Sequence, residues 1–91
     1  TLSVMAKYKI TIKRSAVREI ERLPKDDLKR VLAKIDFLAH EPRGPECIKL
    51  SGDEKYRVRF GLYRILYTIE DDVLVVCVVK VGHRKNVYKQ R

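Results

Sequence analysis

The first half of the chain changes from a strand-like to a helix-like spacing of hydrophobic residues. Every second residue is apolar around residues 7–11, which predicts a short first strand with one buried face. From about Ser15 the apolar residues recur at helical spacing as far as Leu23, and Pro24 then breaks the pattern. Because proline suits the first turn of a helix, a second apolar helix is expected from there until Pro42 interrupts the chain. The two helices should form a hairpin with one apolar side.

The second half alternates as strands do and is divided by two short turns. Strands are predicted over Tyr56–Phe60, Tyr63–Glu70 and Val73–Val81, with Gly61-Leu62 and Asp71-Asp72 as hairpin turns. The last strand is apolar at nearly every position, which predicts a central place in the sheet with both faces covered. The sequence therefore predicts an α+β fold of order β-α-α-β-β-β. In this fold the helical hairpin packs on one face of an antiparallel sheet and the other face stays open.

Length and composition narrow the class of protein. The 91 residues are expected to form a single domain over 1–91, with residues 1–5 as an amino-terminal extension. No apolar run approaches the roughly 20 residues of a membrane-spanning helix, and the amino terminus lacks the apolar stretch of a signal peptide. Cys47 and Cys77 do not have the spacing of a zinc site, and Cys77 is expected in the core. These features predict a cytoplasmic protein without membrane contact or bound metal.

Positive charge is concentrated in two stretches of the second half. The chain carries 21 Lys and Arg against 12 Asp and Glu, a net charge of +9, and no acidic residue lies within residues 55–69 or 79–91. Arg57 and Arg59 alternate with apolar residues, so they should share the open face of the sheet. Since a row of guanidinium groups binds a polyanion well, this face is predicted to handle phosphate. The basic residues of the two stretches are Lys55, Arg57, Arg59, Arg64, Lys80, Arg84, Lys85, Lys89 and Arg91.

Three motifs in this region carry a resemblance to a known family. They are Y-R-V-R at residues 56–59, G-x-Y-R-I-L-Y at 61–67 and V-G-H-R-x-x-V-Y at 81–88. In this order and spacing they resemble the RelE family of bacterial and archaeal toxins, and the preceding strand and helical hairpin fit the same layout. The resemblance implies a toxin that enters the ribosomal A site, cleaves mRNA to leave a 2′,3′-cyclic phosphate and needs no metal or organic cofactor. It also implies three partners, namely a cognate antitoxin protein, the 70S ribosome and mRNA.

The resemblance assigns functional roles to five positions, which are Arg57, Arg59, Arg64, Arg84 and Tyr88. RNA cleavage by its own 2′-hydroxyl requires a proton acceptor, stabilisation of charge on the phosphorane and a proton donor for the leaving oxygen. Arginines meet the second requirement, because a planar guanidinium binds two phosphate oxygens and keeps its charge. Tyr88 would stack on a base or donate a hydrogen bond. The RNA backbone is expected to contact Lys55, Lys80, Lys85 and Lys89.

The proton acceptor is the open question in this set. RelE toxins carry lysines where this chain has Arg57 and Arg59, and an arginine does not release its proton at neutral pH. Three candidates remain, of which we favour His83, because histidine is the side chain that titrates nearest to neutrality. The others are Glu46, in a segment similar to that of YoeB toxins, and Lys55, which is expected on the same face as Arg57. Catalysis by charge alone, with water as the proton carrier, is the remaining alternative.

Two other functions fit the same sequence. A ParE-like toxin shares the fold but inhibits DNA gyrase without cutting RNA, and a non-catalytic relative would only bind RNA or the ribosome. For some residues a structural role is an alternative to a functional one. Glu46 suits an ion pair in a loop, and the buried side of their strands is expected to hold Tyr56, Tyr63 and Tyr67. Ribosome-dependent cleavage, inhibition of supercoiling and salt-sensitive binding without cleavage distinguish the three functions.

Overall fold

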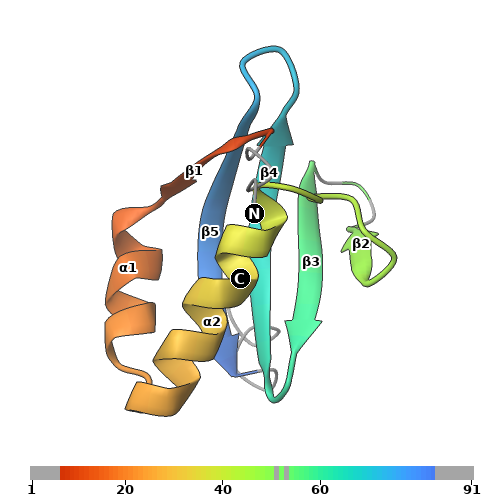
Figure 1. The fold of residues 1–91 in the computed structure, drawn as a ribbon. Coiled ribbons are helices and arrows are strands. Elements are labelled where there is room, and N and C mark those ends of the chain that lie inside the picture. Colours follow the sequence, from red (N-terminus) through yellow and green to blue (C-terminus); the bar gives the residue numbers. More distant parts are fainter. Residues whose placement is uncertain (1–6, 51, 53, 84–91) are drawn as a thin grey trace, which may run out of the picture.

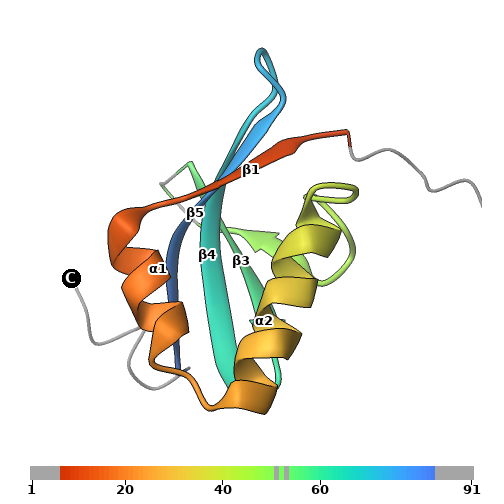
Figure 2. The ribbon, with the colours of Figure 1, turned by 60° about the vertical axis from the view of Figure 1, so that its left-hand side comes forward.

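The chain forms a sheet with two helices on one of its faces. A computed structural model describes residues 7–50, 52 and 54–83. Its elements, in chain order, are β1 (Lys9–Ile12), α1 (Arg14–Glu21), α2 (Lys25–Leu38), β2 (Cys47–Lys49), β3 (Lys55–Phe60), β4 (Tyr63–Glu70) and β5 (Val75–His83). The strand order is β1-β5-β4-β3-β2, and both helices lie on the same side of the sheet (Figure 1, Figure 2). The predicted α+β class is confirmed.

Proline and aspartate residues set the start of the second helix. Pro24 is the N-cap of α2, and Asp26 and Asp27 lie in its first turn, where the positive end of the helix dipole favours acidic side chains. The predicted pair of helices that meet near Pro24 is therefore confirmed. None of the described helices is long and apolar enough to cross a membrane.

The sheet differs from the prediction in two ways. Lys9 of β1 pairs with Val75 of β5 in the parallel direction, so the sheet is mixed rather than antiparallel. A further strand, β2, pairs antiparallel with β3 at the opposite edge. Neither feature follows from the local pattern, because such short strands carry no signal for their pairing partners. The antiparallel order of β3, β4 and β5 is as predicted.

The two hairpin turns have different lengths. Gly61 begins the turn between β3 and β4 with a φ of +60°, which glycine adopts readily, and the predicted two-residue turn is confirmed. The turn between β4 and β5 takes up residues 71–74, so β5 begins at Val75 rather than at Val73. Leu74 has a φ of +54°, and this hairpin projects beyond the rest of the sheet (Figure 2). β5 is flanked by β1 and β4, in agreement with its predicted central place.

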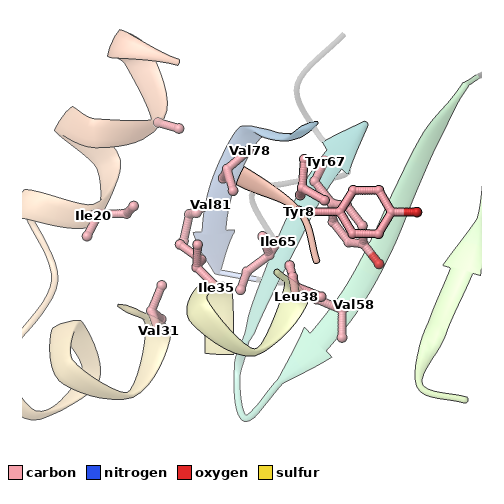
Figure 3. Packing of buried hydrophobic residues seen from close by; sticks show 12 residues of the cluster. Tyr8, Ile20, Val31, Ile35, Leu38, Val58, Ile65, Tyr67, Val78 and Val81 are labelled. Carbon is pink, nitrogen blue, oxygen red and sulfur yellow. The ribbon is translucent and has the colours of Figure 1, made fainter. Parts of the chain in front are cut away.

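The core lies between the helices and one face of the sheet (Figure 3). Tyr67 is fully buried there, as predicted, and its hydroxyl donates a hydrogen bond to the Pro42 carbonyl at 2.6 Å. Cys77 lies opposite Thr68 on the other face and is only half-buried, so its predicted place in the core is wrong. The core residues are Tyr8, Ala16, Ile20, Val31, Ile35, Leu38, Val58, Ile65, Tyr67, Val76, Val78 and Val81.

A polar network ties the β4–β5 hairpin to the loop that precedes β2. Arg43 donates two hydrogen bonds to the carboxylate of Asp71, at 3.1 and 2.8 Å, and one to the Tyr56 hydroxyl at 3.2 Å. Tyr8 donates to the same carboxylate at 2.8 Å. The hydrogen bonds from Arg43 and then Tyr8 lower the pKa of Asp71 to about 2, so this carboxylate is charged at neutral pH. Tyr56, expected in the core, is half-buried and serves this network.

Candidate RNA-binding and catalytic site

Basic residues of β3 and β4 gather on the sheet face that the helices leave open. Val58 and Ile65 lie opposite each other in the core, so their neighbours along each strand point to the other face. The sequence alternation placed the arginines of β3 correctly, and the register of β4 adds another arginine to them. The cations of β3 and β4 that share this open face are Lys55, Arg57, Arg59 and Arg64.

Arg59 and Arg64 form a direct cross-strand pair at the centre of this group. Arg64 is only 6% exposed and its Nε atom is buried, whereas Arg59 is exposed. Like charges placed directly opposite each other weaken a sheet, and burial of a guanidinium adds a desolvation cost. Proteins keep such locally unfavourable arrangements at functional sites, and two guanidinium groups suit an anionic ligand. The pair is therefore the centre of the candidate site.

Lys80 of β5 is held by a residue of α1. Its ammonium group lies 2.6 Å from one carboxylate oxygen of Glu19, and the other oxygen accepts a hydrogen bond from the Val81 N–H at 2.8 Å. Glu19 thus joins α1 to β5 and engages the charge of Lys80. No local pattern indicates this role of Glu19, because the two residues are 61 positions apart. The predicted contact of Lys80 with RNA would have to compete with this ion pair.

His83 lies on the opposite face of the sheet from the arginines. It pairs with Tyr63, and the two rings meet edge to face at a centroid distance of 6.1 Å. The Tyr63 hydroxyl donates a hydrogen bond to Asp27 of α2 at 2.8 Å, which places Tyr63 on the helix side and raises its pKa. A bulge in the β4–β5 pairing shifts the alternation of β5 by one residue, so that Val81 and His83 lie on the helix side and Gly82 lies opposite Arg64. The structure therefore separates the favoured proton acceptor from the arginine pair.

The other predicted residues divide into three groups. Glu46 forms an ion pair with Lys34 at 2.8 Å, which lowers the pKa of Glu46. This agrees with the alternative that Glu46 serves as an ion-pair partner in a loop rather than as a proton acceptor. Lys55 shares the arginine face at the start of β3, as expected. The predicted site residues that lie outside the described part of the chain are Arg84, Lys85, Tyr88 and Lys89.

Comparison with known proteins identifies the family. The family model described as the ParE toxin of the type II toxin–antitoxin system parDE matches residues 10–88. The chain belongs to the RelE/ParE toxin family. One relative of this toxin, named toxin RelE1 in Methanocaldococcus jannaschii, is 30% identical over 87 residues, which cover 91% of this chain and 97% of the relative. The expected membership of this superfamily is confirmed.

Solved structures of RelE toxins share the fold of this RelE/ParE toxin. The matching chain of the RelBE2 toxin–antitoxin complex from Mycobacterium tuberculosis is 28% identical, with a TM-score of 0.78, and the match covers 89% of this chain and 95% of that chain. The corresponding chain of the archaeal RelE–RelB complex from Pyrococcus horikoshii is 32% identical, with a TM-score of 0.77 and coverage of 86% and 96%. This chain is therefore a toxin of a toxin–antitoxin system with the RelE fold.

Proposed function

We propose that this toxin is an mRNA endonuclease that acts on the 70S ribosome and cuts the message in the A site by attack of a 2′-hydroxyl. The observation that carries the proposal is the cross-strand pair of Arg59 and Arg64 on the open sheet face, with Arg57 beside them. Such a face suits the phosphates of an RNA strand. The similarity to RelE toxins over nearly the whole chain supports the same function. The activity would take place in the cytoplasm, where ribosomes and messages are available.

The arginines would act on the phosphate rather than on protons. As O2′ attacks, negative charge grows on the phosphorane oxygens, and positively charged groups fixed nearby stabilise this state more than the ground state. Arg64 suits this role because its burial holds the guanidinium in place before the reaction. Arg59 is exposed and can bind the RNA backbone as it enters the site.

Lys55 is the proton acceptor that the geometry favours. It lies on the arginine face, whereas His83 lies beside Tyr63 on the helix side and Glu46 pairs with Lys34. An ammonium group can release its proton, which a guanidinium cannot do at neutral pH. With its amine in the neutral form, Lys55 would accept the proton of the 2′-hydroxyl, directly or through a bridging water molecule, and the ammonium so formed would return a proton to the departing O5′.

A cognate antitoxin is the expected protein partner. The structures from Mycobacterium tuberculosis and Pyrococcus horikoshii each contain a toxin with its antitoxin. The net charge of +9 would draw an acidic antitoxin segment toward this toxin. Binding of such a segment over the arginine face would block access of RNA.

In vitro translation of a defined message with purified 70S ribosomes, followed by primer extension, tests the proposed cleavage. The wild type should produce a stop within the A-site codon that is absent without ribosomes. Arg59→Gln should lower the cleavage rate by about 100-fold, the usual effect of removing one charge-stabilising group. Lys29→Gln removes the same charge from the exposed outer side of α2 and should cut at the wild-type rate. Equal rates for Arg59→Gln and the wild type would contradict the proposal.

Inhibition of DNA gyrase is a second candidate function. One finding favours it, because the matching family model is that of ParE toxins. ParE-like toxins inhibit gyrase without cutting RNA, so a supercoiling assay with purified gyrase separates the two functions. Inhibition of supercoiling by a protein that leaves ribosome-bound message intact would select the ParE function.

A further inference from the structure

A groove runs along the side of α2 that is nearest to β3, on the helix side of the sheet. Its centre is a hollow of about 400 Å³ between α2 and Phe60 of β3, lined by Arg30, Ala33, Lys34, Phe37 and Phe60. Hollows of about 230 and 310 Å³ adjoin it at the two ends and share lining residues with it. Figure 1 shows α2 and β3 on the two sides of this region. We call the three connected hollows the α2 groove.

The α2 groove has the length and surface of a helix-binding site. Its lining residues on α2 extend from Asp27 to Leu38, which corresponds to roughly 17 Å at 1.5 Å per residue, or about three turns of a second helix. Phe37 is 50% exposed in the middle of the groove, and Leu62 is 58% exposed at one end. Large apolar side chains that gather along one groove mark a binding surface more than isolated exposed residues do.

The two cations at the centre of the groove differ in their surroundings. Lys34 lies 2.8 Å from the Glu46 carboxylate and 5.3 Å from the centre of the Phe37 ring. Arg30 has no acidic partner among residues 7–50, 52 and 54–83. An unmatched guanidinium in an apolar groove is complementary to a carboxylate within an apolar surface. The complementary ligand is therefore apolar with a negative charge at its centre.

We propose that the α2 groove binds an amphipathic helix of a partner protein, whose apolar stripe covers Phe37 and Phe60 and whose carboxylate meets Arg30. A helix presents such a stripe over three turns with apolar residues at i, i+3, i+4 and i+7. An RNA strand is less suited to this groove, because the carboxylates of Asp27 and Glu46 lie at its two ends and would repel the phosphates on either side of Arg30.

The α2 groove is separate from the proposed RNA site. Phe60 lies opposite Tyr63, whose hydroxyl bonds to α2, so Phe60 belongs to the helix side of the sheet. Arg59, its neighbour along β3, points to the open face. A partner helix in the groove would therefore leave the arginine pair uncovered, and changes in the groove should not alter RNA cleavage directly.

Titration of the ¹⁵N-labelled protein with a synthetic peptide tests the proposal. The probe is an amphipathic peptide of about three to four helical turns, with leucines at i, i+3, i+4 and i+7 and one glutamate beside the centre of this stripe, which makes it the acidic peptide. A control peptide has a lysine in place of the glutamate. The acidic peptide should shift the amide signals from Arg30 to Phe37 and that of Phe60, and the lysine peptide should bind more weakly.

Variants on one helix provide matched controls. Phe37→Ala and Arg30→Glu should each weaken peptide binding about tenfold, as loss of a central contact does. Leu32→Ala and Lys29→Glu make equivalent changes on α2 outside the groove, where Leu32 is 44% exposed, and they should bind as the wild type does. Thermal unfolding of each variant shows whether it is folded.

Four results would overturn the proposal. The first is that the acidic peptide at about 1 mM shifts no amide of α2, and the second is that the shifts map to the arginine face. The third is that Lys29→Glu weakens binding as much as Arg30→Glu does. The loss of affinity would then come from the change in net charge and not from a contact with Arg30. The fourth is that the groove binds a different ligand, either single-stranded RNA or a second copy of the chain detected by sedimentation. In that case Phe37→Ala would abolish binding of that ligand.

Discussion

Replacement of Arg59 by glutamine should make the protein more stable and less active at once. Arg59 lies directly opposite Arg64. Side chains in such a pair start close together, and two unit charges roughly 6 Å apart repel by ~0.7 kcal/mol at the dielectric constant of water, about 80. Removal of one charge should therefore raise the free energy of unfolding by about that amount, or the melting temperature by roughly 3–6 °C for a domain of this size. Cleavage should fall by about 100-fold.

Salt dependence shows whether this gain in stability has the stated cause. The Debye length is about 30 Å at 0.01 M salt and about 3 Å at 1 M, so the repulsion acts at low salt and is screened at high salt. Urea unfolding followed by circular dichroism should show the stabilisation of Arg59→Gln at low salt and its loss at 1 M. A variant that is less stable than the wild type, or a difference that salt does not change, would refute this account of the arginine pair.

Three further variants test separate features. Tyr67→Phe leaves the buried Pro42 carbonyl without its hydrogen bond and should lower the free energy of unfolding by about 1–3 kcal/mol in urea denaturation; unchanged stability would contradict this role of the hydroxyl. Asp71 has a folded-state pKa of about 2 against an ordinary 3.8, so its stabilising contribution is present above pH 3.8 and is lost as the pH falls toward 2. Wild type should therefore exceed Asp71→Asn in stability at neutral pH, and the difference should disappear near pH 2 in the same assay. Arg57→Lys should keep or raise the cleavage rate in the ribosome assay if a titratable group is required there, whereas a large loss would show that the fixed guanidinium is needed.

The elements that could be predicted from the sequence are those whose signals are local. The helical spacing on both sides of Pro24 lies within the helices themselves, and Gly61 marks its own turn. The short strand β2 and the parallel pairing of β1 with β5 could not be predicted in this way. Both depend on contacts between residues far apart in the chain, for which the pattern of one segment carries no information.

In the candidate site, too, the features with a local signal could be predicted and those that depend on distant contacts could not. Alternation along β3 was sufficient to place Arg57 and Arg59 on one face, because no irregularity interrupts that strand. The face of His83 could not be inferred, since the bulge in the β4–β5 pairing reverses the alternation before the strand reaches it. The ion pair of Glu19 with Lys80 joins α1 to β5 and has no counterpart in either local sequence.

The parallel pairing of β1 with β5 also affects when the toxin can fold during its own synthesis. β1 is made early, but β5, which separates it from β4, is the last of the elements in the described part of the chain to be made. Val76, Val78 and Val81 of β5 belong to the core, so a nascent chain that lacks β5 has neither a closed core nor a link between its first strand and the rest of the sheet. A chain shortened before β5 should therefore be inactive, and the ribosome that makes the toxin should have translated the segment that encodes β5 before the toxin can act.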